Sequence, residues 1–174
     1  IQLVKNNKNE FKTNNKFTVL FVGRLSPEKG IDLLIDSFAS SLNENKNMVL
    51  KIVGEGPMYS DILKKINSDK ILMNKVFLIP KNKNIDLYYK KCDLLVIPSR
   101  YEGFPNVLLE GLNHNLNIIA TKIIDEYEVF KKIENINFIN VNDMNALTNS
   151  INYFYKKKSS NQEKNENLIN ILQK

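Results

Sequence analysis

The chain has 174 residues, 43% of them hydrophobic and 25% charged, and its 25 Lys and Arg against 19 Asp and Glu give a net charge of +6. This length and composition are typical of one globular domain with a sizeable core. The one cysteine, Cys92, excludes an internal disulfide framework, and the one histidine, His114, excludes a multi-histidine metal site, while no apolar run is long enough to predict a membrane span or a signal peptide.

The predicted elements begin at Phe17, because residues 1–16 are rich in Asn and Lys and aperiodic. We interpret residues 1–16 as a linker or an arm from a preceding domain, 17–158 as the folded domain, and 159–174 as a tail that could form one more helix. Short apolar runs predict strands at 17–23, 48–54, 76–80, 93–99, 116–121 and 136–141. Amphipathic stretches between them predict helices at 30–42, 58–67, 85–92, 106–114, 125–133 and 143–158.

Strands that are apolar throughout and alternate with helices indicate an α/β fold with a doubly wound parallel sheet, similar to a Rossmann fold. In such sheets ligands bind beyond the carboxyl ends of the strands, so the loops there are the places to search. Gly23 and Gly30 lie too far apart for the dinucleotide-binding glycine turn, and the chain has no P-loop. The ligand is therefore held by some other arrangement of these loops.

The basic charge allows several kinds of partner. The lysines are scattered among asparagines, as in KNNKN (5–9) and KNKN (81–84), which favours a solvated surface and no nucleic-acid partner. A basic face resting on an anionic membrane stays open as the alternative. We expect a cytoplasmic location, with this peripheral membrane contact as an option.

The segment PSRYEGFPNVLLEGL (98–112) runs from a strand through a turn into a helix that begins near Asn106. The free amides and positive dipole end of that helix suit an anion such as a diphosphate. Glu102 in the loop and Glu110 one turn into the helix can accept hydrogen bonds from sugar or ribose hydroxyls. Each glutamate by itself could equally be a solvated surface acid.

The same segment resembles the signature of the retaining family-four glycosyltransferases, which have the two-domain GT-B fold. The resemblance implies that Glu102 contacts the transferred sugar and Glu110 the ribose of the donor. It also implies that backbone amides at Phe104, Asn106 and Val107 meet the sugar and the phosphates. The chain would then be one half of a GT-B enzyme.

A second segment, FVGRLSPEKGIDLLIDSF (21–38), is similar to another motif of that family. The match implies that Gly23 lies in the donor site and that Arg24 and Lys29 hold the donor phosphates. Two fixed cations near helix amino termini can offset charge on a departing diphosphate without a metal ion. The alternative is that these cations form surface pairs with Glu28 or, for Lys29, with Asp32.

Weaker matches follow in the expected order. The turn IVGEGP (52–57) resembles the family's glycine turn beside the nucleotide, which places Gly54 in the site, and Pro80 stands where a Gly is common near the base-binding loop. We expect Cys92 to be a small core residue and His114 to cap a helix or to be exposed.

The resemblance implies a carboxy-terminal, donor-binding domain whose full enzyme transfers a hexose or N-acetylhexosamine with retention. We expect a nucleoside diphosphate sugar, in particular a UDP-sugar, as donor, no cofactor and no metal, and a glycan or lipid-linked acceptor bound through an amino-terminal domain. Bacterial cell-surface polysaccharide synthesis, such as O-antigen or capsule, is the expected setting, and residues 1–174 alone should be inactive. The alternatives are a non-catalytic nucleotide-sugar-binding module and a GT-B epimerase or sugar phosphorylase.

Overall fold

The computed structural model describes residues 16–81, 84–103, 106–123 and 127–172, with side chains up to residue 160. Its strands are β1 (Phe17–Val22), β2 (Met48–Val53), β3 (Val76–Ile79), β4 (Leu94–Ile97), β5 (Asn117–Thr121) and β6 (Ile136–Ile139). Its helices are α1 (Ile31–Glu44), α2 (Tyr59–Ser68), α3 (Ile85–Lys91), α4 (Asn106–Asn113), α5 (Tyr127–Phe130) and α6 (Met144–Leu172), with single 3-10 turns η1 (Pro27–Lys29) and η2 (Leu72–Asn74).

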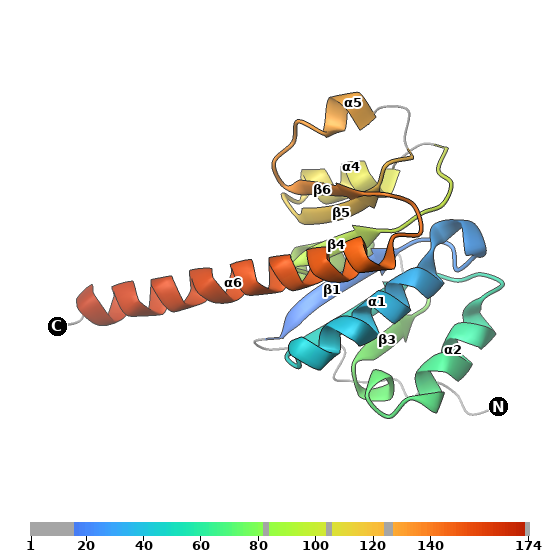
Figure 1. The fold of residues 1–174 in the computed structure, drawn as a ribbon, viewed down its shortest axis with the longest axis horizontal. Helices are drawn as coiled ribbons and strands as arrows, with labels where there is room; N and C mark the ends of the chain where they lie inside the picture. The colour runs from blue at the N-terminus through green and yellow to red at the C-terminus, as the bar shows by residue number, and fades with distance from the viewer. Residues whose placement is uncertain (1–15, 82–83, 104–105, 124–126, 173–174) are drawn as a thin grey trace.

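The six strands form one parallel sheet in the order β3-β2-β1-β4-β5-β6 (Figure 1). The predicted doubly wound parallel α/β fold is therefore confirmed. Each predicted strand is present, and all except β5 end one or two residues earlier than their apolar runs, because the last residues of those runs already turn into the loop that follows.

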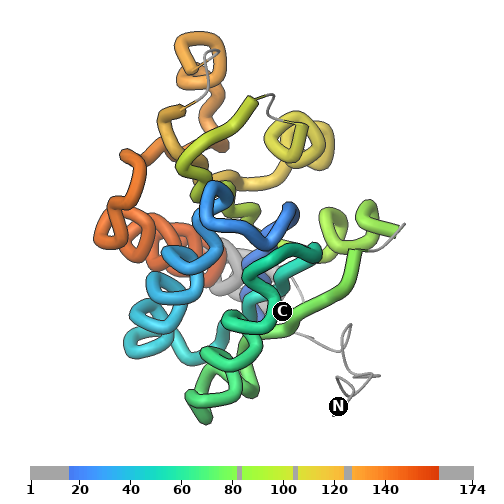
Figure 2. The backbone as a smooth tube through the Cα atoms, turned by 90° about the vertical axis from the view of Figure 1, so that its right-hand side faces the viewer, coloured from blue at the N-terminus to red at the C-terminus, as the bar shows by residue number. Residues whose placement is uncertain are grey.

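Helices cover both faces of the sheet, as Figure 2 shows with α1 and α6 on one side and α3 and α4 on the other. The two faces correspond to two apolar clusters. One joins the sheet to α1, α2 and α6, and the other joins it to α3, α4 and α5. A sheet that is buried on both faces explains why its strands are apolar throughout rather than alternating.

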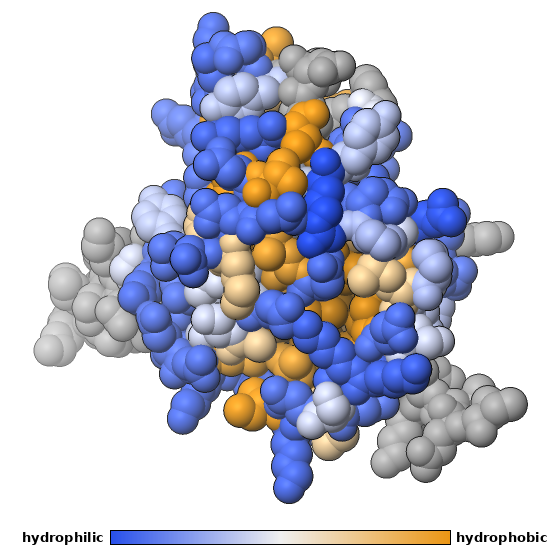
Figure 3. All heavy atoms as spheres, turned by 45° about the vertical axis from the view of Figure 1, so that its right-hand side comes forward, coloured by the Kyte–Doolittle hydropathy of each residue, from blue (hydrophilic) through white to orange (hydrophobic). Residues whose placement is uncertain are grey.

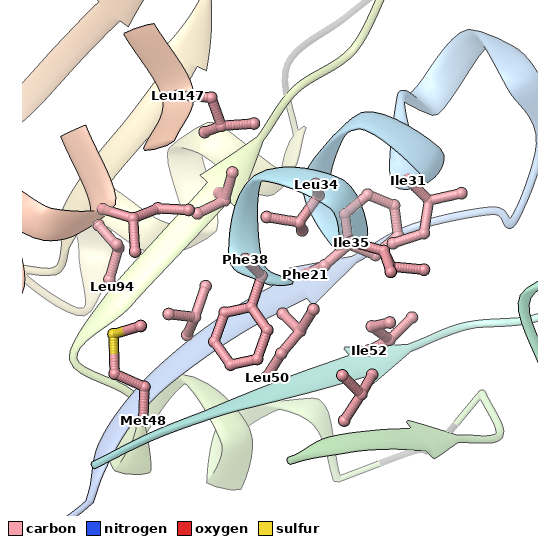
Figure 4. Packing of buried hydrophobic residues seen from close by; sticks show 14 of the residues in the cluster. Phe21, Ile31, Leu34, Ile35, Phe38, Met48, Leu50, Ile52, Leu94 and Leu147 are labelled. Atoms are coloured by element: carbon pink, nitrogen blue, oxygen red, sulfur yellow. The ribbon is translucent and has the colours of Figure 1, made fainter. Parts of the chain in front are cut away.

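The first cluster is built from the apolar stripe of α1, whose residues recur at helical spacing. Leu34, Ile35 and Phe38 point from α1 toward Leu50 and Ile52 of β2 (Figure 4). All five side chains have no exposed surface. Burying an apolar side chain of this size stabilises a fold by about 1.5–3 kcal/mol, so this contact holds α1 against the sheet.

The strand order reverses between β1 and β4, which lie side by side at the centre of the sheet. The chain leaves β1 toward α1 on one face and leaves β4 toward α4 on the other. The loops after β1 and β4 therefore diverge, and this point of an open parallel sheet is where ligand crevices form.

The carboxyl-terminal region differs from the sequence prediction. Residues 159–172 form no separate helix but continue α6, which has 29 residues and extends beyond the body of the domain (Figure 1). No Gly or Pro stands in this stretch to end the helix. Although α6 is long, neither it nor another helix within the described ranges is apolar enough over a sufficient length to cross a membrane.

Candidate functional site

A cleft of about 630 Å³ opens at the carboxyl ends of the strands, on the side where β1, β2 and β3 end and α4 begins. Its walls include five of the residues that the sequence assigned to a donor site: Gly23, Arg24, Gly54, Val107 and Glu110. Figure 3 shows apolar atoms gathered in the middle of the molecule, framed by hydrophilic side chains. An apolar cleft with a few convergent polar groups is the usual form of a small-molecule site.

Other predicted residues lie elsewhere. Pro80 is exposed and does not line the cleft; its neighbour Lys81 does. Asn106 is the exposed first residue of α4 and is also absent from the walls, since the helix presents its next residue, Val107, to the cleft. Phe104 lies outside the described residues.

The floor of the cleft is made by two loops whose backbones are in direct contact. The amide of Gly23 donates to the carbonyl of Val53 (3.1 Å), and the amide of Leu25 donates to the carbonyl of Glu55 (2.9 Å). A Cβ added at Gly54 would lie 1.8 Å from the carbonyl oxygen of Gly23, so no larger residue fits there. The glycine turn after β2 therefore lets the loop after β1 approach and brings Arg24 to the cleft.

Lys29 and Glu102 face each other across the loops after β1 and β4. Lys29 Nζ lies 2.6 Å from Glu102 Oε2, and the two side chains are 26% and 11% exposed. The hydroxyl of Ser99 donates to the other oxygen, Glu102 Oε1 (2.9 Å), and Ser99 is itself held at its carbonyl by the hydroxyl of Thr121 (2.6 Å). The Glu102 carboxylate is thus fixed through both oxygens beside a lysine.

Arg100, which the sequence reasoning did not single out, fastens the Glu102 loop to the start of α1. Its guanidinium donates to both carboxylate oxygens of Asp32 (2.8 Å each) and to the carbonyl of Pro27 (2.6 Å). Its Nε donates to Asn142, in the loop before α6. The guanidinium hydrogen bonds lower the pKa of Asp32 below its usual value. The alternative prediction of a Lys29–Asp32 ion pair is therefore wrong, because both carboxylate oxygens of Asp32 accept hydrogen bonds from Arg100.

Arg24 is exposed on the cleft wall, and no hydrogen bond or ion pair of its side chain is found within the described residues. The alternative prediction, an ion pair between Arg24 and Glu28, is not found. Glu28 instead accepts a hydrogen bond from the Ser26 hydroxyl (2.6 Å), which is the main reason that its pKa is lowered, with Arg24 and Lys29 contributing at longer range. Arg24 is thus a cation that a ligand can use.

Glu110 lies on α4 at the cleft, and its carboxylate accepts a hydrogen bond from the buried hydroxyl of Tyr89 (2.6 Å). The ring of Tyr89 lies against that of His114, with centroids 5.1 Å apart. His114 links α4 to α3: Nδ1 lies 2.8 Å from the carbonyl oxygen of Glu110, and Nε2 lies 2.7 Å from Asp86 Oδ1. Because both partners are acceptors, the doubly protonated ring is favoured and the pKa of His114 is raised, first by the Glu110 carbonyl and then by Asp86.

Asp93 and Cys92 precede β4, at the edge of the sheet opposite the cleft, and have structural surroundings. The Asp93 carboxylate accepts from the amide of Thr18 (2.8 Å) and from Lys158 Nζ (2.6 Å), so it joins the start of β1 to α6. Cys92 is buried, as predicted, and burial raises the pKa of its thiol to about 12. Within the described ranges, no group of three or more His, Cys, Asp or Glu side chains is placed to hold a metal ion.

The family profile described as glycosyl transferases group 1 matches residues 4–174, nearly the whole chain. The chain belongs to this family. The predicted relation to the family-four enzymes, as the carboxy-terminal half of a GT-B glycosyltransferase, is confirmed.

Curated relatives and solved structures agree with this assignment. An uncharacterized glycosyltransferase of Methanocaldococcus jannaschii is 34% identical over 119 residues, which are 68% of this chain and 29% of that protein. A UDP-Gal:alpha-D-GlcNAc-diphosphoundecaprenol alpha-1,3-galactosyltransferase of Escherichia coli is 29% identical over 79% of this chain and 36% of its own length. Anabaena HepE, solved in complex with UDP and glucose, has the same fold, with a TM-score of 0.74 at 24% identity over 84% of this chain and 40% of that one. This glycosyltransferase chain thus spans about a third of the two curated relatives.

Proposed function

We propose that this chain is the donor-binding domain of a retaining glycosyltransferase that uses a UDP-sugar. The observation that carries the proposal is the cleft at the carboxyl ends of β1–β3, which is lined both by Arg24, an arginine with no ion pair among the described residues, and by Glu110, whose carboxylate is held by Tyr89. An arginine suits a diphosphate and a carboxylate suits ribose hydroxyls. The relatives whose names include UDP support the same donor class.

In this proposal the donor extends from the cleft to the Lys29–Glu102 pair, whose side chains are not among those that line the cleft. Arg24 and Lys29 bind the diphosphate, Glu110 binds the ribose, and Glu102 contacts the transferred sugar. Gly23, Gly54 and the amides that begin α4 border the nucleotide and phosphates. The three residues with catalytic roles are Arg24, Lys29 and Glu102.

The cations have a chemical task as well as a binding one. When the bond between the sugar and the diphosphate breaks, negative charge grows on the leaving phosphate oxygens. Positively charged donors already held at that place stabilise the charge without reorganising. Lys29 is held next to Glu102 at 2.6 Å, so a cation and the sugar-binding carboxylate lie side by side, as transfer at the junction of phosphate and sugar requires.

The acceptor and the setting belong to the proposal too. We propose that the full enzyme transfers a hexose or N-acetylhexosamine to a glycan or lipid-linked acceptor held by an amino-terminal domain. Bacterial cell-surface polysaccharide synthesis at the cytoplasmic membrane face is the proposed setting. The names of two relatives support this setting. One is an amylovoran biosynthesis glycosyltransferase of Erwinia amylovora, and the name of the E. coli galactosyltransferase includes a diphosphoundecaprenol-linked sugar.

Calorimetry with the chain of 174 residues tests the donor assignment. UDP and UDP-sugars should bind, GDP and ADP should bind less tightly, and a transfer assay with the same chain should show no turnover. Absence of UDP binding, or binding with equal affinity for every nucleoside diphosphate, would contradict the proposal of a UDP-sugar donor.

The proposed neutralisation of the phosphates by side chains makes a second test possible. Because Arg24 and Lys29 supply the positive charge, UDP affinity should be the same with magnesium and with EDTA. Abolition of UDP binding by the chelator would show that a metal ion, and not these cations, holds the diphosphate.

A further inference from the structure

Tyr89 is a nearly fully buried residue with a polar group aimed at the proposed donor site. It lies on α3, is 1% exposed, and belongs to the apolar cluster formed by α3, α4 and the sheet. Its hydroxyl lies 2.6 Å from Glu110 Oε2, and Glu110 forms part of the cleft wall on the neighbouring helix. The side chain therefore connects the core to the cleft.

The direction of this hydrogen bond follows from the chemistry of the two groups. An ionised carboxylate only accepts, so the tyrosine hydroxyl donates. Burial, and then the contact with Glu110, raise the pKa of Tyr89 well above its usual value, so the hydroxyl keeps its proton at all physiological pH values. The tyrosine occupies one lone-pair site of the carboxylate, and the remaining sites can accept ribose hydroxyls.

The backbone and ring surroundings fix Tyr89 in place. Its ring contacts the His114 ring, and His114 is bound to the carbonyl of Glu110 and to Asp86 on α3. Glu110 itself is an exposed residue. An exposed glutamate side chain would otherwise lose conformational entropy when it binds a ligand. The hydrogen bond from the Tyr89 hydroxyl restricts the side chain before binding and so removes much of that entropic cost in advance.

We propose that Tyr89 is a positioning residue that presents the Glu110 carboxylate to the ribose of the donor. The inference rests on the proposed function, because it names what orients the ribose-binding group of that same site. Tyr89 touches no donor atom and acts through Glu110.

The Tyr89→Phe variant tests the inference because it keeps the buried ring and removes only the hydroxyl. We expect UDP to bind roughly 5-fold more weakly, since preorganisation of one side chain is lost, while inorganic pyrophosphate binds within about 2-fold of wild type. In a Glu110→Ala background the same change should have no further effect on UDP. Tyr155→Phe removes a tyrosine hydroxyl on the opposite face of the sheet, against Phe17, and should leave both affinities unchanged.

The outcomes are separable. If wild type does not bind UDP, the proposed function fails. If wild type binds UDP and Tyr89→Phe, shown by its melting curve to be folded, binds UDP as tightly, the positioning role is wrong. Equal weakening for UDP and pyrophosphate, or an undiminished loss in the Glu110→Ala background, would also overturn it, because a general structural defect would not depend on ribose or on Glu110.

Discussion

Two parts of the proposed donor site hold their functional side chains by different means. At the phosphate end, which we define as Arg24, Lys29 and Glu102, the lysine and the glutamate hold each other through an ion pair. At the ribose end, which we define as Tyr89 and Glu110, a neutral hydroxyl holds the carboxylate. A donor can therefore join Glu110 without displacing a cation, whereas at the phosphate end it competes with an existing ion pair for Lys29.

This difference makes Arg24 and Lys29 unequal. Arg24 is exposed and makes no ion pair among the described residues, so its whole charge is available to a diphosphate. Lys29 already shares its charge with Glu102. The phosphate end should consequently respond to changes in Glu102, and the ribose end should not.

The largest expected effect is on the folding of the phosphate end. Gly30, which follows Lys29, has φ +66°, and a Cβ there would lie 2.0 Å from the carbonyl oxygen of Pro98. Gly30→Ala should lower the free energy of unfolding by about 3 kcal/mol or more, because the start of α1 must separate from the end of β4. Gly103→Ala, where no atom lies within 4 Å of the added Cβ, should change it by less than about 0.5 kcal/mol in urea denaturation. Similar losses in both variants would mean that the two loops are not packed as described.

Measurements of UDP affinity should distinguish the roles of Arg24 and Lys29. Arg24→Ala should weaken UDP by ~1.5–3 kcal/mol, the range for charge-assisted hydrogen bonds. Lys29→Ala should weaken UDP at least as much, since it also leaves the Glu102 carboxylate uncompensated near the diphosphate. The double variant Lys29→Ala/Glu102→Ala should recover part of that loss in calorimetry.

The exposed Lys156→Ala variant on α6 is the matched control for loss of one positive charge, and it should leave UDP affinity unchanged. A double variant no better than Lys29→Ala alone would show that Glu102 has no electrostatic influence on the phosphates.

A smaller effect is expected at the Arg100–Asp32 contact that supports the phosphate end. Arg100→Ala should destabilise the domain by about 1–2 kcal/mol at neutral pH, a bidentate pair discounted for its partial exposure. The pKa of Asp32 is lowered in the folded state, so the contribution is present above the usual Asp pKa of 3.8 and disappears as the pH falls through the lowered value. Urea denaturation from pH 7 to well below pH 3.8 checks this, with Lys64→Ala, which removes an exposed helix ion pair, as control. A stability difference between wild type and Arg100→Ala that does not shrink as the pH falls below 3.8 would contradict the role of the charged pair.

The smallest effect concerns His114 beside the ribose end. Because its pKa is raised above 6.5, its contribution to stability is complete below that pH and is lost as the pH rises through the raised value. Wild type should lose slightly more stability than His114→Gln between pH 6 and pH 8 in thermal melts. The ring is partly exposed and its partner Asp86 more so, which keeps the effect small. Identical pH profiles would mean that the histidine is not held by Glu110 and Asp86.

The sequence predicted the sheet well because the apolar runs of a buried parallel sheet are unambiguous, and several of the loops it singled out border the observed cleft. It did not predict Arg100 or Tyr89 as part of the site, since the contacts of Arg100 with Asp32 and of Tyr89 with Glu110 join residues 68 and 21 positions apart and exist only after folding. Pro80 was assigned to the cleft from its place in a motif, yet the wall is formed by the next residue, Lys81, because a loop can turn within one residue. The sequence predicted a helix that ends at 158 and a separate tail, whereas α6 continues to Leu172 because no Gly or Pro ends it.

UDP calorimetry on Glu102→Ala and Glu110→Ala tests whether the ribose, the diphosphate and the sugar of the donor are bound in that order, by Glu110, by the two cations and by Glu102. Glu110→Ala should weaken UDP by about 1.5–3 kcal/mol and spare pyrophosphate, because its partner is the ribose. Glu102→Ala should leave UDP affinity unchanged or raise it a few-fold, because UDP lacks the sugar and Lys29 is released from its ion pair. An equal loss of UDP affinity in the two variants would contradict this order, even with the fold intact.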